Sequence, residues 1–168
     1  MRDQAIADSQ GARHGRMPGE IYRSTKVYDH NEGLSCCFRQ WRASHSHCRL
    51  LHGYALAFRF VFATTTLDEN NWCLDFGSLQ PVRAWLKEMY DHTLLVSEDD
   101  PQLMNFQMLA KDGLARVQIM PSVGCEATAK FTFNFVSRLV REMTGRRVWL
   151  ESVEVREHGG NSAIYAIE

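Results

Sequence analysis

One alternating segment decides the fold of this chain: residues 52–63 read His-Gly-Tyr-Ala-Leu-Ala-Phe-Arg-Phe-Val-Phe-Ala. Successive side chains of a β-strand point to opposite faces of the sheet, so every second residue shares a face. One face of this segment carries its large side chains, which are His52, Tyr54, Leu56, Phe58, Phe60 and Phe62. The alternation predicts a long strand whose aromatic face turns inward, with His52 at its start.

The flanking segments predict an α+β domain with an antiparallel sheet. Further strands are expected at residues 34–42, 72–76, 116–120, 148–157 and 162–167. Helical spacing of apolar residues predicts a helix that follows Ser78 as its N-cap, a shorter helix over residues 101–111 and a longer one over residues 126–144. Gly145 is expected to stop the last helix.

Composition places the chain among ordinary globular proteins. It has 168 residues, of which 45% are hydrophobic and 23% charged, and a formal net charge of −1. This balance gives no indication of a nucleic-acid partner, and no apolar run approaches the roughly 18 residues of a membrane span. We expect a flexible polar lead over residues 1–20 and one domain over residues 21–168. Five irregularly spaced cysteines indicate reduced thiols and a cytoplasmic protein.

Residues 45–54 hold the strongest chemical signal, because three histidines fall within eight residues with a cysteine among them. Imidazole nitrogens of His45, His47 and His52 could hold a divalent metal, and zinc is the usual occupant of such a site. Ordinary loop histidines are the alternative. Cys48 lies beside Arg49 and these imidazoles, and cationic surroundings favour the thiolate as base or nucleophile. The alternative for Cys48 is an inert buried thiol.

Three further positions carry candidate side chains. Asp91 and His92 follow the first predicted helix, where an acid and an imidazole can join one proton relay. Glu157 ends a predicted strand, and its two carboxylate oxygens can accept hydrogen bonds from the edge of a 2-amino-pyrimidinone ring. Glu126 begins the long helix, where an acid also suits the helix dipole.

Several motifs occur in the order found in the 6-pyruvoyl-tetrahydropterin synthase family, which includes the 6-carboxy-tetrahydropterin synthases. Residues 41–45 (Trp-Arg-Ala-Ser-His) resemble its Phe-x-Ala-x-His, and residues 48–54 (Cys-Arg-Leu-Leu-His-Gly-Tyr) resemble its Cys-x-x-x-His-Gly-His. Residues 74–79 resemble Asp-Phe-x-x-Leu, and residues 91–95 resemble Asp-His-x-x-Leu. Val155, Glu157 and Tyr165 resemble the closing Val-x-Glu and Tyr, and Glu126 matches Pro-Thr-x-Glu. The matches cover roughly residues 34–168.

The resemblance implies a tunnelling fold, with a four-stranded antiparallel sheet and two main helices that assemble into barrels. It implies a homo-oligomer, a trimer or a hexamer, with active sites between subunits. The substrate would be 7,8-dihydroneopterin triphosphate and the cofactor zinc. Cys48 would be the catalytic thiol, assisted by Asp91 and His92, and Glu157 would anchor the pterin, with Glu126 beside it.

Two departures from the family pattern leave alternatives open. Tyr54 stands where the family has its third zinc histidine, so the third ligand is Tyr54 or His47, or the metal site has degenerated. The spacing from Cys48 to His52 resembles that of the bacterial 6-carboxy-tetrahydropterin synthases, which implies a lyase that forms 6-carboxy-5,6,7,8-tetrahydropterin on the route to 7-deazaguanine and queuosine. The alternatives are the 6-pyruvoyl-forming enzyme and a protein that binds a pterin or purine without turnover.

Overall fold

A computed structural model describes residues 19–167, so nearly all of the predicted flexible lead lies outside the described residues. The strands are β1 (Tyr22–Tyr28), β2 (Leu34–Phe38), β3 (His52–Thr64), β4 (Thr93–Ser97), β5 (Val117–Met120), β6 (Val148–His158) and β7 (Asn161–Ala166). The α-helices are α1 (Gln80–Tyr90), α2 (Leu103–Lys111) and α3 (Cys125–Met143). Short 3-10 turns are η1 (His30–Glu32), η2 (His47–Arg49) and η3 (Phe76–Leu79).

The sheet is mixed, with the strand order β5-β4-β2-β3-β6-β7 and with β1 also paired to β3. The first residues of β3 pair with β2 and its later residues pair with β1, which lets one long strand join both parts of the sheet. Strand β4 is parallel to both β2 and β5. The predicted four-stranded antiparallel sheet with two main helices is therefore wrong, because the described residues form seven strands and three α-helices.

Strand β4 escapes a search for alternation because all five of its residues are buried. A strand covered on both faces reads as a continuous apolar run, without the polar residues that mark a solvent face. Strand β1 was missed for the opposite reason: its exposed residues alternate with half-buried ones, and polar side chains occur on both faces, so it has little hydrophobic signal of its own. Its position comes from the seven residue pairs that it makes with β3.

Two local predictions also fail around the first helix. Residues 72–75 form no strand, and the chain passes through η3 directly into α1. Asp75, rather than Ser78, caps this turn: its side chain accepts a hydrogen bond from the Gly77 amide at 2.8 Å, whereas the Ser78 hydroxyl donates to the Asp75 carbonyl. An Asp side chain satisfies the free N–H groups of a helical start as well as Ser does.

The other predicted helices and the closing hairpin are confirmed with small changes in their ends. Gly113 and Gly145 follow α2 and α3 with φ angles of +71° and +58°, the left-handed conformation that favours glycine at a helix end. None of the helices within residues 19–167 is long and apolar enough to cross a membrane.

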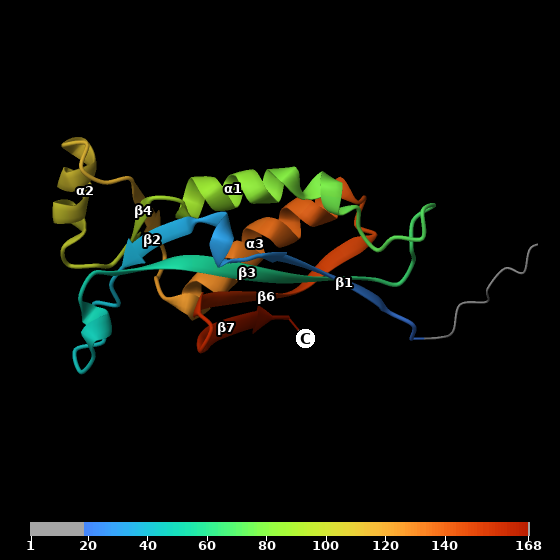
Figure 1. Cartoon of the computed structure of the whole chain (residues 1–168), viewed down its shortest axis with the longest axis horizontal. Coiled ribbons are helices and arrows are strands. Elements are labelled where there is room, and N and C mark those ends of the chain that lie inside the picture. The colour runs from blue at the N-terminus through green and yellow to red at the C-terminus, as the bar shows by residue number, and fades with distance from the viewer. Residues whose placement is uncertain (1–18, 168) are drawn as a thin grey trace, which may run out of the picture.

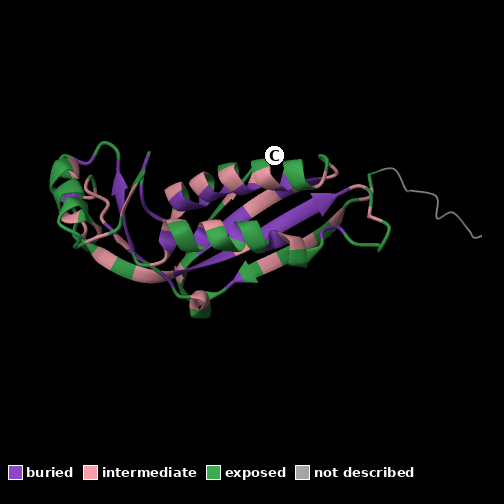
Figure 2. Ribbon diagram, turned by 90° about the horizontal axis from the view of Figure 1, so that it is seen from above, coloured by how far each residue is buried: buried purple, intermediate pink, exposed green. Residues whose placement is uncertain are grey.

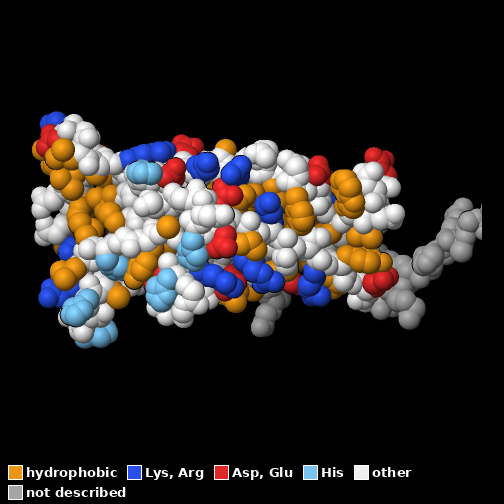
Figure 3. Space-filling model, viewed as in Figure 1, with side chains coloured by type: hydrophobic (Ala, Val, Ile, Leu, Met, Phe, Trp, Pro, Cys, Tyr) orange, Lys and Arg blue, Asp and Glu red, His pale blue; other side chains and the backbone are white. Residues whose placement is uncertain are grey.

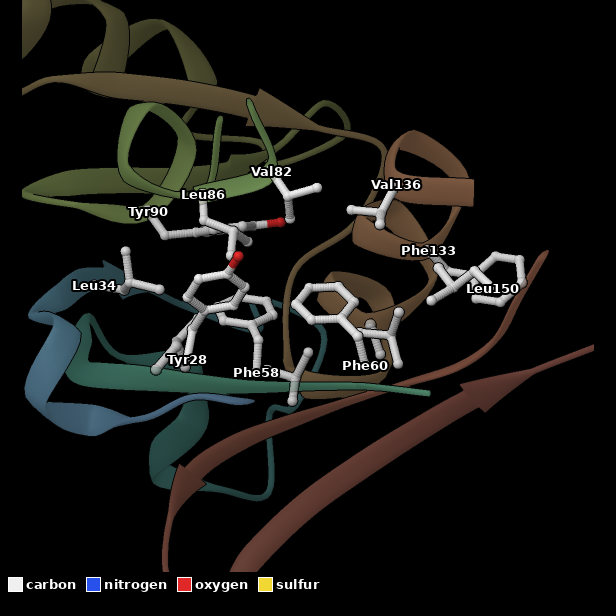
Figure 4. Packing of buried hydrophobic residues seen from close by; sticks show 14 of the residues in the cluster. Tyr28, Leu34, Phe58, Phe60, Val82, Leu86, Tyr90, Phe133, Val136 and Leu150 are labelled. Carbon is white, nitrogen blue, oxygen red and sulfur yellow. The ribbon is translucent and has the colours of Figure 1, made fainter. Parts of the chain in front are cut away.

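Helices α1 and α3 lie side by side over one face of the sheet (Figure 1). The ribbon coloured by burial shows buried strands beneath helices whose outer sides are exposed (Figure 2). Phe58, Phe60 and Phe62 are completely buried under these helices, which confirms the inward face predicted for β3. Figure 4 shows Phe58 and Phe60 of β3 facing Tyr90 and Val136 from the helices.

A second, smaller cluster lies on the other face of the sheet. Leu94 and Val96 of β4 pack there against Phe106 of α2, and Cys37 of β2 joins them. Adjacent residues of β2 therefore serve different faces, because Cys36 packs into the large core and Cys37 into the small one. This division decides where the candidate catalytic side chains lie.

Candidate active site

The start of β3 brings two ring side chains of the candidate site together. His52 and Tyr54 share a face, with ring centroids 5.4 Å apart at an interplanar angle of 87°. Phe38 of β2 packs beneath both, at 5.0 Å from His52 and 6.1 Å from Tyr54. Because Phe38 is 1% exposed, it fixes the two rings on the rim of the hydrophobic core.

Hydrogen bonds to the ring nitrogens set the chemistry of two histidines. His52 Nδ1 lies 2.7 Å from the Leu50 carbonyl oxygen, so Nδ1 carries the proton and Nε2 keeps a free lone pair. His158, whose ring centroid lies 6.2 Å from that of Tyr54, accepts a hydrogen bond on Nδ1 from the Gly160 amide. The neutral His158 ring therefore carries its proton on Nε2. His52 Nε2 can therefore accept a hydrogen bond or bind a metal ion, and His158 Nε2 can donate a hydrogen bond.

Tyr54 is the point on which the polar groups of the site converge. Burial raises the pKa of the Tyr54 phenol, and the Glu157 carboxylate and the Cys48 and Cys125 thiols raise it further. These groups come from β3, β6, the η2 turn and the start of α3. Since the phenol stays protonated, Tyr54 is a hydrogen-bond donor, and a neutral phenol is a poor metal ligand.

Cys125, which the sequence patterns did not single out, contacts the predicted pterin anchor. The pKa of the Cys125 thiol is raised to about 12, first by burial and then by the charges of Glu157 and Glu126 and a hydrogen bond to the Glu157 side chain. Cys125 begins α3 and Glu157 lies near the end of β6, so this contact ties the two elements together. The position of Cys125 directly before Glu126 was the only signal in the sequence.

The loop between β2 and β3 carries the remaining histidines. His45 and His47 are exposed, Cys48 is half-buried, and histidine side chains gather over this end of the molecule (Figure 3). Within residues 19–167, no three His, Cys, Asp or Glu side chains are arranged to hold a metal ion. The donors match zinc in kind, but the structure does not bring the predicted His45, His47 and His52 together.

Asp91 and His92 form a close pair at the end of α1. His92 Nδ1 lies 2.5 Å from Asp91 Oδ1. The pair is held by the backbone, because His92 has a φ of +56° and its amide donates to the Ser35 carbonyl at 2.6 Å. A left-handed residue other than glycine is uncommon, and this one turns the chain from α1 into β4.

This pair lies on the face of the sheet opposite Tyr54. His92, Gly53 and Cys37 line a hollow of about 330 Å³ beside Arg116. Gly53 and Cys37 point away from the large core, whereas Tyr54 packs against it. Because the sheet separates the two faces, His92 and Cys48 of one chain do not share a site.

Comparisons with known proteins identify the family of this chain. Residues 28–168 match the profile of the family described as 6-pyruvoyl tetrahydropterin synthase. The chain belongs to this family. Its members are lyase-type enzymes of pterin chemistry. The chain is also 26% identical over 98 residues to the 6-carboxy-5,6,7,8-tetrahydropterin synthase of Aquifex aeolicus (strain VF5). That alignment covers 56% of this chain and 60% of the relative.

Solved structures of other proteins share the fold of this chain. An uncharacterized protein from Wolinella succinogenes superposes with a TM-score of 0.74 at 18% identity, covering 89% of this chain and 99% of the other. The 6-pyruvoyl tetrahydropterin synthase of Plasmodium vivax superposes with a TM-score of 0.63 at 13% identity, covering 87% and 97%. At these identities the likeness shows the fold alone.

Proposed function

We propose that this protein is a tetrahydropterin synthase that converts 7,8-dihydroneopterin triphosphate into 6-carboxy-5,6,7,8-tetrahydropterin. The observation that carries the proposal is that His52 and Tyr54 lie on one face of β3, with ring centroids 5.4 Å apart, where the Cys48 thiol and the Glu157 carboxylate raise the pKa of the Tyr54 phenol, in a chain of this family. The Aquifex relative, which is named for the 6-carboxy product, supports this product over the 6-pyruvoyl one. A route to 7-deazaguanine and queuosine and a cytoplasmic location belong to the same proposal.

Each side chain has a distinct task in the proposed reaction. The Glu157 carboxylate accepts hydrogen bonds from the 2-amino-pyrimidinone edge of the pterin, with Glu126 at the neighbouring helix start. The Cys48 thiolate takes a proton from the substrate side chain. Loss of that proton allows the carbon–oxygen bond to triphosphate to break. Formation of the 6-carboxyl group further requires water to add to the inner side-chain carbon and the bond to the two outer carbons to break, so that these carbons leave as acetaldehyde. The neutral Tyr54 phenol donates a hydrogen bond to the bound substrate.

Zinc would polarise the hydroxyl groups of the substrate side chain. His52 Nε2 is prepared to be one ligand, and the raised pKa of Tyr54 favours His45 and His47 as the others. These three donors do not converge in the described residues, so binding requires the exposed 45–47 segment to close toward His52.

A second copy of the chain supplies Asp91 and His92 in this proposal. The sheet separates this pair from Cys48 within one chain, so the relay reaches the thiol only across an interface. A homo-oligomer, a trimer or a hexamer with sites between subunits, satisfies that requirement. Mixing a Cys48→Ala chain with a His92→Ala chain tests it, because each inactive variant would restore the group that the other lacks.

Incubation with 7,8-dihydroneopterin triphosphate tests the reaction itself, with mass spectrometry of the pterin products. We expect 6-carboxy-5,6,7,8-tetrahydropterin from the natural protein and none from Cys48→Ala. Cys73→Ala is the matched control, because Cys73 is a thiol beside Phe62, near the other end of β3. A 6-pyruvoyl product would replace the product assignment, and full turnover by Cys48→Ala would remove the thiol from the mechanism.

One observation favours a second candidate, a protein that binds a pterin or purine without turnover. The metal donors do not converge, and the third family histidine is replaced by Tyr54. Under this alternative, calorimetry would detect pterin binding that depends on Glu157, while the turnover assay would give no product with or without added zinc.

A further inference from the structure

The loop that carries Cys48 is anchored by an acidic turn between β4 and α2. In Figure 1 this loop and α2 lie at the same end of the molecule. The anchoring residues Asp99 and Asp100 lie about 60 positions further along the chain than the loop residues they bind: 61 for Arg39–Asp100 and 58 for Trp41–Asp99.

Asp100 forms the inner anchor. Arg39 donates to both of its carboxylate oxygens, from Nε at 2.9 Å and from Nη2 at 2.6 Å. The Asp100 side chain is only 1% exposed, and it also accepts from the Gln102 amide at 2.8 Å. The Arg39 guanidinium lies 5.6 Å from the centre of the Phe106 ring of α2. Burial opposes ionisation of Asp100, but the hydrogen bond from Arg39 prevails and lowers its pKa.

Asp99 forms the outer anchor. Its carboxylate accepts from the Ser97 hydroxyl at 2.6 Å and from Trp41 Nε1 at 3.1 Å, and it pairs with Arg42 Nη2 at 2.6 Å. The Arg42 guanidinium stacks 4.5 Å over the Trp41 ring. The hydrogen bonds from Ser97 and Trp41 lower the pKa of Asp99 to about 2, so this anchor is charged at neutral pH.

Both anchors connect to Cys48 through the backbone. Gln40, which lies between the anchored Arg39 and Trp41, donates its amide to the Cys48 carbonyl at 2.7 Å. Its side chain lies against Gly124 at the start of α3, so close that a Cβ at Gly124 would meet Gln40 Nε2 at 2.4 Å. Fixing residues 39–42 therefore also fixes the thiol relative to the helix that begins with Cys125.

We propose that Asp99 and Asp100 are positioning residues for Cys48, holding the loop of residues 39–48 so that the thiol faces Tyr54 and Glu157. The proposal rests on the proposed function for its catalytic meaning. A displacement of about 1 Å at a reacting group can lower the rate by up to roughly 100-fold. Release of a loop that is held through three side chains is therefore enough to cause a loss of that size.

The test compares Asp99→Asn and Asp100→Asn with Glu151→Gln. Glu151 is a matched control because Arg23 binds its carboxylate with the same forked geometry, at 2.7–3.0 Å, near the far end of β3. In the turnover assay we expect kcat to fall about tenfold or more in the two Asp variants, with KM changed by less than about threefold. Asp99→Glu, which keeps the charge, should recover part of the loss.

A second measurement does not depend on turnover. Alkylation rates of individual thiols are followed by mass spectrometry of peptides. We expect Cys48 to react about tenfold faster in the Asp variants, because its loop is released. Cys73, which is 5% exposed, should react at the natural rate, since it reports general unfolding.

An unchanged Cys48 rate in both Asp variants would overturn the proposal. So would a parallel rise at Cys48 and Cys73, because that result means general loss of stability. Absence of pterin turnover in the natural protein would refute the proposed function, while the alkylation rates would still decide whether these residues position Cys48. If Asp100→Asn fails to fold, the exposed Asp99 variant decides.

Discussion

His52 Nδ1 donates a hydrogen bond to the Leu50 carbonyl at 2.7 Å, two residues before it in the chain. This contact leaves the Nε2 lone pair of His52 free at the start of β3. A backbone acceptor on one ring nitrogen is the arrangement that orients metal-binding histidines through the other.

We therefore expect purified protein reconstituted with zinc to hold about one ion per chain, a single catalytic-type site. His52→Ala should lose the ion, as should a His45→Ala and His47→Ala double variant. His92→Ala should keep it, because His92 lies on the other face of the sheet. Elemental analysis after dialysis measures the content. Retention of zinc by His52→Ala would place the ion elsewhere.

Substitution of the pterin anchor is expected to weaken catalysis strongly. Glu157→Gln replaces one accepting oxygen by a donor, and a hydrogen bond to a charged group is worth about 1.5–3 kcal/mol. The value of kcat/KM should fall roughly 10- to 100-fold. Glu151→Gln on the same strand is the control. Glu126→Gln should have a smaller effect, and a larger one would make Glu126 the principal anchor.

Stability is expected to fall at alkaline pH. Burial raises the pKa of Cys36 to about 12, so the folded state keeps a proton that the unfolded thiol loses above its ordinary pKa of 9.0. The unfolded state then binds fewer protons, and the free energy of unfolding decreases as pH rises toward 12.

The pH effect is measured by urea unfolding between pH 8 and about 11, where one such group contributes a slope of up to about 1.4 kcal/mol per pH unit. Removing the thiol in Cys36→Ala should lower that slope. Part of the slope should remain in the variant, because burial also raises the pKa of Tyr28 to about 12. Identical slopes in both proteins would contradict the assignment to Cys36.

Gly124→Ala should destabilise the fold more than Gly113→Ala. Both glycines have positive φ angles, +107° and +71°, so both substitutions carry a conformational cost of about 1 kcal/mol or more. A Cβ at Gly113 meets nothing within 4 Å, whereas one at Gly124 would displace Gln40. Urea unfolding of the two variants measures the difference. Equal losses would show that Gln40 moves away without cost.

Local sequence patterns predicted those strands and helices whose own residues show a periodic alternation of apolar and polar side chains. The alternation of residues 52–63 placed β3 and its inward aromatic face, and helical spacing placed α3. Neither requires knowledge of a distant partner, because a strand or helix that is solvated on one side shows its period in its own residues. Ordered motifs along the chain likewise sufficed to predict the family, which the profile match confirms.

Candidate site residues were predicted singly, but their grouping was not. Sequence order placed Cys48 near His45 and His47, whereas in the fold its thiol, the Cys125 thiol and the Glu157 carboxylate all raise the pKa of the Tyr54 phenol. Asp91 and His92 were predicted as a pair, and the sheet separates them from the thiol they were expected to assist. The face of the sheet on which a side chain lies depends on the pairing of strands that are far apart in the sequence.

The sequence by itself determined the long aromatic strand, the amphipathic helices and the family, since these rest on spacing between near neighbours. Tertiary structure decided the parallel addition of β4 and β5, because strand pairing joins residues far apart in the sequence and because the fully buried β4 shows no alternation. It also decided that Asp99 and Asp100 hold the loop of Cys48. Those contacts join residues about 60 positions apart, and only the folded chain brings such charges within hydrogen-bonding distance.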